Sequence, residues 1–463
     1  MRFPLLSKLG AMALVVIMVM CAIWRIEGLV DERHRRSLDA REGVEQSHAK
    51  AQVVVGPLLA RRCVEEVTTT TQVDGHPVSQ VVSNAFALVQ PPTTLAVAGR
   101  TRMQPLHRGL FKVNAYDGLF DAVAEFSSFE ALRPRAAHGG RVTCEAVRLM
   151  MSPSDVRGVR AVDASVDGKA LEVQAGIPTG SLPRGFSAAL PTGRGEPGDA
   201  AVLTAHVKLD LAGTSALSWV PAAGTTTWKL GADWPHPSFG GRFLPAERTV
   251  HDDGFEATWR LSALATDAPE QVAKGDTACV EALADDPENL ASGRRFCIDT
   301  MTVSYIDPVN PYVLSDRAVK YALLFVVLTF VAVGLVEVLS GRRVHPVQYL
   351  LVGLALSLFF LLLLSLSEQL PFGVAYGFAA AACVGLLAFY ASSMFGRRGA
   401  GFGFGAGAAL LYGLLYALLQ REQDALAIGS VMLFAALATV MGLTRRLDWY
   451  ELFARVRRAD APR

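Results

Sequence analysis

Long apolar runs dominate the last third of this 463-residue chain. Five of them follow one another with short polar breaks, at residues 319–339, 347–366, 372–394, 402–419 and 427–443. The hydrocarbon core of a bilayer is about 30 Å thick, and a helix rising about 1.5 Å per residue needs roughly 20 residues to cross it. Exposed backbone polar groups are not tolerated in lipid, and a helix satisfies them within its own segment. The pattern therefore predicts a membrane block of five spanning helices over residues 318–443.

A shorter apolar run, residues 9–23, follows a basic N-terminus that contains Arg2 and Lys8. It is either a cleaved signal peptide or a first spanning helix. Signal peptidase requires small residues after the run, but Trp24, Arg25 and Glu27 stand there, so we expect an uncleaved signal anchor at 9–24. The polar stretch 31–50 has helical character and is expected to extend this anchor.

Between residues 53 and 312 the apolar runs become short, rich in β-branched residues and interrupted by Gly, Pro and Asp. This texture predicts a soluble, mainly antiparallel β domain. A Gly- and Pro-rich stretch at 176–198 is the expected seam if the domain has two subdomains. The predicted strands are residues 64–73, 78–89, 109–115, 119–126, 142–150, 201–211, 225–231, 255–262 and 296–306.

The fold class predicted from these patterns is a polytopic α-helical membrane protein with six spanning helices. The β domain, residues 25–317, is inserted between the first and second helices. Cytoplasmic loops are enriched in Lys and Arg, and this bias fixes orientation. Arg342, Arg343, Arg397 and Arg398 fall in alternate loops, and the tail 444–463 is basic. Both termini, including residues 1–8, are therefore expected in the cytoplasm and the β domain in the periplasm.

Composition adds little to this picture except through cysteine. The formal net charge is +1, which gives no reason to expect a nucleic-acid partner. Four cysteines fall in the β domain: Cys63, Cys144, Cys279 and Cys297. An oxidising compartment permits two disulfides among them, with three possible pairings. We prefer Cys279–Cys297; the alternative is that some of these residues are free, buried thiols.

The usual signatures of catalysis and cofactor binding are missing from the sequence. It contains no HExxH, P-loop or GxSxG motif and no paired-cysteine metal spacing, so we expect no cofactor, no metal and no enzymatic activity. Gly401, Gly403, Gly405 and Gly407 open an apolar helix, which favours close helix packing over phosphate binding. Glu337 and Glu368 lie near the ends of apolar runs, so the membrane block resembles an anchor more than a transport pathway.

One stretch of the β domain is a candidate binding ridge. In residues 234–239 two prolines stiffen the backbone, and this rigidity would display Trp234, His236, Ser238 and Phe239 at low entropic cost. The alternative is a rigid crossover whose aromatic residues fill the core and whose imidazole finds a hydrogen bond.

Several motifs, in this order, resemble the CreD family of bacterial inner-membrane proteins. They are residues 55–58 (VGPL), 233–239 (DWPHPSF), 243–245 (FLP), 315–321 (SDRAVKY), 345–353 (HPVQYLLVG), 366–368 (LSE) and 448–450 (DWY). Arg61, Arg62 and Cys63 depart from the more apolar continuation of the family pattern. The resemblance implies an inner-membrane protein of Gram-negative bacteria linked to a two-component system and to envelope integrity. It supplies no catalytic residues.

Three functions remain open on this basis. The first is a non-enzymatic envelope protein, held in the lipid bilayer, whose periplasmic domain contacts an unidentified envelope protein or other component. The second is a transporter or exporter of a small amphiphile or lipid. The third is a periplasmic hydrolase that uses His236. Oligomeric state is not indicated by the sequence.

Overall fold

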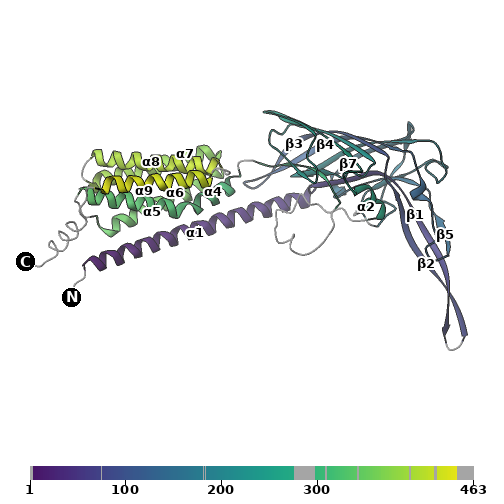
Figure 1. Ribbon diagram of the computed structural model, residues 1–463, viewed down its shortest axis with the longest axis horizontal. Coiled ribbons are helices and arrows are strands. Elements are labelled where there is room, and N and C mark those ends of the chain that lie inside the picture. The colour runs from purple at the N-terminus through teal and green to yellow at the C-terminus, as the bar shows by residue number, and fades with distance from the viewer. Residues whose placement is uncertain are drawn as a thin grey trace, which may run out of the picture. The chain divides into compact units, whose positions relative to one another are not determined.

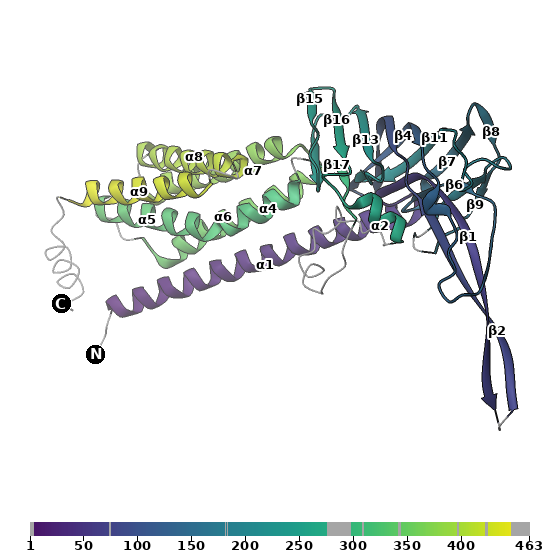
Figure 2. The ribbon, with the colours of Figure 1, turned by 45° about the vertical axis from the view of Figure 1, so that its right-hand side comes forward.

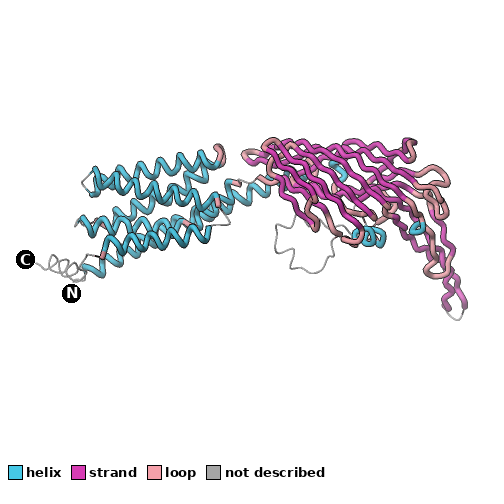
Figure 3. The backbone as a smooth tube through the Cα atoms, turned by 45° about the horizontal axis from the view of Figure 1, so that its top comes forward, coloured by secondary structure: helices cyan, strands magenta, loops and turns pink. Residues whose placement is uncertain are grey.

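The computed structural model describes residues 4–73, 76–180, 182, 184–275, 298–307, 310–340, 344–395, 398–421 and 425–445. The chain forms two compact units, one of Met1–Leu38 with Val309–Arg463 and the other of Asp39–Pro308. Long helices make up the first unit and strands dominate the second (Figure 3).

The helical unit holds the predicted spans. Five described helices are long and apolar enough to cross a membrane, and α4 with α5, bent by 45°, gives a sixth if the two form one span. The predicted second span, 319–339, therefore begins inside α4 and includes the break. The helices are α1 (Pro4–Ser47), α4 (Pro311–Lys320), α5 (Ala322–Ser340), α6 (Pro346–Ser367), α7 (Phe372–Phe395), α8 (Arg398–Gln420) and α9 (Ala425–Thr444).

Helix starts in this unit follow from local chemistry. Asn310 caps α4 because its side-chain oxygen accepts a hydrogen bond from the N–H of Tyr312 at 3.0 Å. His345 caps α6, and the side chain of Gln348 accepts in return from the N–H of His345. A proline follows each cap, where its missing N–H costs nothing. At the N-terminus, α1 continues unbroken to Ser47, so the helical character predicted for residues 31–50 is confirmed as far as Ser47.

The β unit contains two sheets (Figures 1 and 2). The nine-stranded sheet has the order β14-β17-β12-β1-β6-β10-β9, with β2 and β5 also paired to β1. Its strands are β1 (Gln52–Val73), β2 (His76–Gln90), β5 (Arg141–Cys144), β6 (Arg148–Pro153), β9 (Val173–Ala175), β10 (Phe186–Ala189), β12 (Ala216–Trp219), β14 (Pro237–Gly241) and β17 (Met301–Tyr305).

The eight-stranded sheet has the order β15-β16-β13-β3-β4-β11-β7-β8. All described strand pairs are antiparallel except β1–β12 and β3–β13. The strand pairing of the β unit is therefore mainly antiparallel, as predicted. The strands are β3 (Thr94–Arg108), β4 (Phe111–Phe126), β7 (Val159–Val166), β8 (Lys169–Leu171), β11 (Leu203–Thr214), β13 (Thr225–Ala232), β15 (Glu247–His251) and β16 (Gly254–Ser262). The short helices are η1 (Glu130–Leu132), η2 (Val156–Gly158) and α2 (Ala268–Lys274).

Both sheets contribute to one hydrophobic core. Trp219 of β12 packs against Phe120 of β4 with ring centroids 5.8 Å apart, and Trp228 of β13 stacks on Trp259 of β16 at 4.4 Å. All three tryptophans are fully buried. The stretch predicted as a seam, 176–198, contains β10, which pairs with β6 and β9, so residues on both sides of it belong to the same unit.

Two predicted strands, 109–115 and 119–126, are a single strand, β4. The two predicted ranges left out residues 116–118, but Gly118 lies within the strand and makes room for a ring. A Cβ on Gly118 would lie 2.5 Å from a ring carbon of Phe120, and one on Gly99 of β3 would lie 2.3 Å from another. Glycine in a strand can mark such a close approach, not only a turn.

A two-stranded arm extends from the nine-stranded sheet (Figures 1 and 2). Strands β1 and β2 pair from Leu59 opposite Gln90 to Val73 opposite His76. The neighbouring strand β5 accompanies β1 only from Cys63 to Glu66. Beyond Glu66, β1 and β2 therefore pair only with each other among the described strands.

Candidate functional site

The predicted ridge becomes a turn followed by an edge strand. Asp233 accepts a hydrogen bond from the N–H of Met103 at 2.7 Å, and the Trp234 indole N–H donates to the carbonyl of His236 at 3.0 Å. Residues 237–241 form β14, which pairs with β17 at one end of the nine-stranded sheet. Pro237 fits there because proline is tolerated on edge strands. The turn is thus held from within and from β3.

The two aromatic residues of the ridge are tied to the core. Phe239 is half-buried and packs edge-on against Phe255 and Trp259, with centroid distances of 5.5 and 5.9 Å. Trp234 is also half-buried, and the ammonium of Lys112 lies 5.5 Å from its ring centroid. Arg248 lies over the Phe239 ring at 5.9 Å. These contacts support the alternative account for Trp234 and Phe239, in which they fill the edge of the core.

His236 differs from its neighbours because it remains exposed. Its ring lies edge-on to Trp234 at 6.3 Å, and no carboxylate or hydroxyl in the described part of the chain hydrogen-bonds to it. A catalytic imidazole requires such a partner to orient it and adjust its basicity. Ser238 is half-buried in β14. The ridge therefore offers an exposed imidazole on a rigid support and no catalytic arrangement.

A second structured feature lies at the root of the arm. Cys63 of β1 and Cys144 of β5 form a disulfide. This pairing was open in the sequence, where the preferred bridge was Cys279–Cys297. Those two cysteines lie outside the described residues, so their bridge remains a prediction. Of the three ways to pair four cysteines, the one that contains Cys63–Cys144 also pairs Cys279 with Cys297.

Next to the disulfide, Glu65 is a buried carboxylate, with a side chain 2% exposed. It accepts hydrogen bonds from the N–H groups of His138 at 2.8 Å, Gly140 at 3.0 Å and Ala137 at 3.2 Å. The N–H of His138 is the main cause that lowers the pKa of Glu65 below its ordinary value of 4.5, with the other two acting in the same direction. The carboxylate therefore fixes the loop before β5 onto β1.

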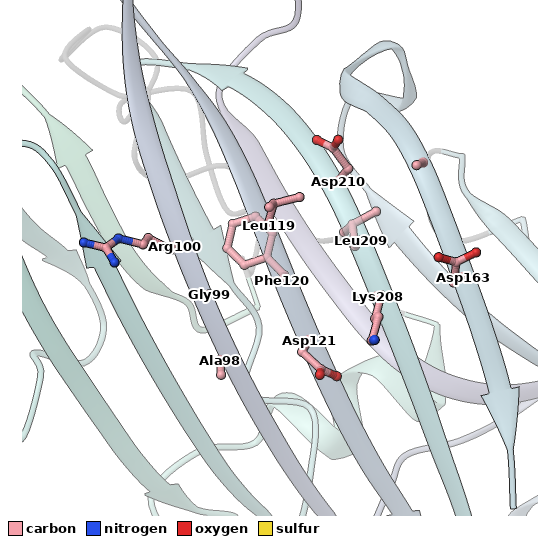
Figure 4. Close-up of a pocket in the computed structure, with 11 residues that line it drawn as sticks. Ala98, Gly99, Arg100, Leu119, Phe120, Asp121, Asp163, Lys208, Leu209 and Asp210 are labelled. Atoms are coloured by element: carbon pink, nitrogen blue, oxygen red, sulfur yellow. The ribbon is translucent and has the colours of Figure 1, made fainter. Parts of the chain in front are cut away.

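An open concavity of about 590 Å³ lies on the eight-stranded sheet (Figure 4). Asp121 of β4 lies opposite Lys208 of β11, which lies opposite Asp163 of β7, and all three side chains are exposed. Opposite charges on neighbouring strands stabilise a sheet by roughly 0.2–1 kcal/mol per pair. Within the described residues, no three His, Cys, Asp or Glu side chains form a group that could hold a metal ion. We therefore interpret the concavity as a solvated face of the sheet that carries paired charges.

In the helical unit, Glu337 and Glu368 are each bonded to a tyrosine of another helix. Glu368, at the end of α6, lies 3.7 Å from Arg33 of α1 and is hydrogen-bonded to Tyr312 of α4. Glu337 of α5 accepts a hydrogen bond from Tyr349 of α6 at 2.9 Å. The sequence placed these acids near helix ends but gave no sign of the tyrosines. The Tyr349 bond joins the first part of α6 to α5, and the Glu368 bond joins the end of α6 to α4.

A unit of long apolar helices attached to a large two-sheet unit defines a multi-pass membrane protein with an extramembrane domain. The chain belongs to the CreD family, whose model, described as Inner membrane protein CreD, matches residues 4–450. It is 31% identical over 452 residues to Inner membrane protein CreD of Escherichia coli (strain K12), covering 97% of this chain and 95% of that protein. The predicted family is therefore confirmed, and the protein is an inner membrane protein.

Comparison with solved structures adds nothing to this assignment. The M1 zinc metallopeptidase of Deinococcus radiodurans is 12% identical, with a TM-score of 0.20, over 37% of this chain and 38% of that one. A likeness of this size supports no statement about fold or activity.

Proposed function

We propose that this protein is a non-enzymatic component of the bacterial envelope. Its helices anchor it in the inner membrane, and its β unit, on the periplasmic side, contacts another envelope protein. The family resemblance adds a role in envelope integrity under two-component control. Support for the absence of catalysis comes from His236, the one histidine singled out by the sequence, because it lacks an acid or nucleophile partner among the described residues.

The observation that carries the contact proposal is the position of the ridge at a sheet edge. β14 is the terminal strand of the nine-stranded sheet, so its outer backbone edge has no partner strand in the described part of the chain. An extended segment of another protein binds such an edge through main-chain hydrogen bonds. Because Trp234 and Phe239 are anchored in the core, the edge and the exposed His236 are already rigid, which lowers the entropic cost of binding.

Photo-crosslinking in intact cells tests this proposal. A photoreactive residue replaces His236, and the control carries it at Lys169, an exposed position of β8 in the same unit. We expect a protein adduct of discrete mass from position 236 and none from position 169.

The opposite results are equally clear. Identical adducts from both positions would indicate nonspecific collision with the domain surface. The absence of an adduct at position 236, in protein shown to be inserted and folded, would contradict a contact at this edge.

A further inference from the structure

Strand β2 of the arm is an edge strand (Figures 1 and 2). Among the described strands it pairs only with β1, so its outer edge has no partner strand. At its base, the side chain of Gln90 accepts a hydrogen bond from the N–H of Ala131 at 3.3 Å. Further out, residues 80–85 are exposed at every position, on both faces of the strand. The other edge of the arm, on β1, is open only beyond Glu66, because β5 pairs with residues 63–66.

The side chains of β2 do not protect this edge. Natural proteins block a free strand edge with charged residues, proline or a bulge. Strand β2 carries no Asp, Glu, Lys or Arg, and its one proline, Pro77, is the second residue of the strand. Val81 and Val82 are 59% and 38% exposed, and successive side chains of a strand point to opposite faces, so each face carries an apolar group. An edge of this kind is a template for another strand.

The main chain of the edge determines the kind of ligand that fits it. A row of N–H and C=O groups is satisfied along its whole length by an extended strand, and not by a helix or a lipid chain. The arm itself would gain from such a strand, since a hairpin of two strands is at best marginally stable in water. The ligand of this edge is therefore a β-strand.

The sequence of the edge matches itself when two copies run antiparallel. In the register with a two-fold axis at Val82, this residue lies opposite its own counterpart, and Gln80 lies opposite Asn84. Valine then meets valine and amide meets amide, and matched cross-strand pairs stabilise a sheet. Residues 80–85 carry no formal charge, so identical strands do not repel each other, whereas a charged peptide would find no counter-charge there. These features favour a second copy of the chain.

We infer that β2 is a dimerisation strand, through which the arms of two copies of this chain pair antiparallel and form a four-stranded sheet. Each copy offers one β2 edge, so the two-fold contact is closed and stops at two copies. The Cys63–Cys144 bridge and the hydrogen bonds of Glu65 hold the root of each arm and thus fix the position of the edge. The contact uses β2 and not β14, so it and the contact proposed above can fail separately.

Disulfide trapping in membranes of intact cells tests both the contact and its register. Two full-length chains with different tags are co-expressed, one with Gln80→Cys and the other with Asn84→Cys. Both have serine in place of the four other cysteines outside the Cys63–Cys144 bridge, which are Cys21, Cys279, Cys297 and Cys383. We expect mild oxidation to join the two tags, because opposite residues have Cβ atoms about 5 Å apart. Two chains that both carry Gln80→Cys should give roughly ten-fold less product, since their thiols are offset by about 13 Å along the strands.

Substitutions at the two-fold axis distinguish a second copy from any other partner. Val82→Lys in both chains places like charges opposite each other and should lower the product between positions 80 and 84 roughly ten-fold. Val82→Lys in one chain with Val82→Glu in the other replaces repulsion by attraction and should restore the product. Binding to a different protein would not depend on residue 82 of a co-expressed copy.

Chains with Lys169→Cys, at an exposed position of β8, measure random collision in the same membranes. Peptide mapping of the Cys63–Cys144 bridge shows which variants are folded. In folded protein, the proposal would be overturned by the absence of product between positions 80 and 84, by equal product from the thiols at position 169, or by no recovery with the Lys–Glu pair. A product that joins position 80 to a different envelope protein would overturn it as well.

Discussion

At the scale of single residues, Glu65 is a buried carboxylate on β1 of the β unit. A carboxylate this deeply buried is stable only when its oxygens are hydrogen-bonded, and here three backbone N–H groups provide those bonds. Because the bonds favour the charged form, they lower the pKa, so Glu65 contributes to stability in a manner that depends on pH.

We expect Glu65→Gln to release the loop before β5. A neutral amide oxygen accepts weaker hydrogen bonds than a carboxylate, so the amides of Ala137, His138 and Gly140 should exchange with solvent roughly ten-fold faster or more. Hydrogen exchange followed by mass spectrometry measures this. The amides of β11, which belongs to the eight-stranded sheet whereas Glu65 lies on β1 of the nine-stranded sheet, serve as the internal control. Unchanged exchange in the loop would show that Glu65 does not hold it.

The same residue predicts a pH effect. The folded pKa of Glu65 is lower than its ordinary value, so its stabilising contribution is complete above about pH 4.5 and is lost as pH falls through the lowered folded value. The urea midpoint of the wild type should therefore exceed that of Glu65→Gln near pH 7, and the difference should shrink in acid. A difference that grows as pH falls would contradict the assigned direction.

Residues of the ridge should separate into structural and exposed groups. Phe239→Ala removes a half-buried ring that packs on Phe255 and Trp259, so we expect a loss of about 2–3 kcal/mol in the free energy of unfolding. His236→Ala alters an exposed side chain and should change the free energy of unfolding by no more than about 0.5 kcal/mol. Urea unfolding of the two variants measures both values. Equal losses would mean that His236 has a structural role.

The sequence identified the ridge but could not assign roles within it. Two prolines in a row of aromatic residues predicted rigidity, and the hydrogen bond from Trp234 to the carbonyl of His236 is consistent with it. Phe239 faces the core because it packs on residues of β16, which come more than a dozen residues later in the chain. No local pattern in the ridge indicates this contact. The Glu368–Tyr312 and Glu337–Tyr349 bonds escaped prediction for the same reason, since each joins two helices.

At the scale of elements, the arm depends on its root. An isolated two-stranded hairpin is at best marginally stable in water, and the arm beyond Glu66 pairs with no third strand among those described. The disulfide from Cys63 to Cys144 and the bonds of Glu65 both fix β5 beside β1 at this point.

Removing the disulfide should therefore destabilise the β unit. For Cys63→Ser combined with Cys144→Ser we expect a loss of about 2–4 kcal/mol, because the cross-link joins positions 81 residues apart and restricts the unfolded chain. Chemical unfolding measures the loss, with Cys21→Ser as a control, since Cys21 is a free, exposed cysteine. If the double variant unfolds at the same urea concentration as the control, the cross-link has no stabilising role.

Helix packing in the membrane block gives a paired prediction. Gly405→Leu places a side chain where a Cβ alone comes within 2.7 Å of Ala388, so α7 and α8 must separate, at a cost of about 1–3 kcal/mol. Gly403→Leu meets nothing within 4 Å and should leave the melting temperature in detergent close to that of the wild type. A lower melting temperature for Gly403→Leu than for Gly405→Leu would contradict the roles assigned to these two glycines.

Elements marked by a long apolar run were predicted well. Elements that depend on pairing with distant parts of the chain were not. The apolar runs gave α6, α7, α8 and α9 within a few residues, because each helix satisfies its own backbone. β3 was missed since Arg100, Arg102 and His107 break the apolar pattern, and its pairing with β4 and β13 supplies the stabilisation instead. Residues 142–150 were predicted as one strand but form parts of β5 and β6, which pair with different segments of β1.

At the scale of the whole molecule, orientation is the assumption on which the proposed function depends. The distribution of arginines among the loops predicts that the β unit lies in the periplasm. A disulfide between Cys63 and Cys144 agrees with this prediction, because disulfides persist in the periplasm and are rare in the cytosol. If the β unit were cytoplasmic, neither the disulfide nor contact with a periplasmic partner would be expected.

The most direct test is thiol labelling of spheroplasts with a membrane-impermeant maleimide. Gln80→Cys places a thiol on an exposed position of the arm, in a chain whose Cys21, Cys383, Cys279 and Cys297 are changed to serine. Ala459→Cys, in the basic tail, is the matched control. We predict that the thiol at position 80 reacts in intact spheroplasts and that the thiol at position 459 reacts only after lysis. The reverse pattern would place the β unit in the cytoplasm and contradict the proposed function.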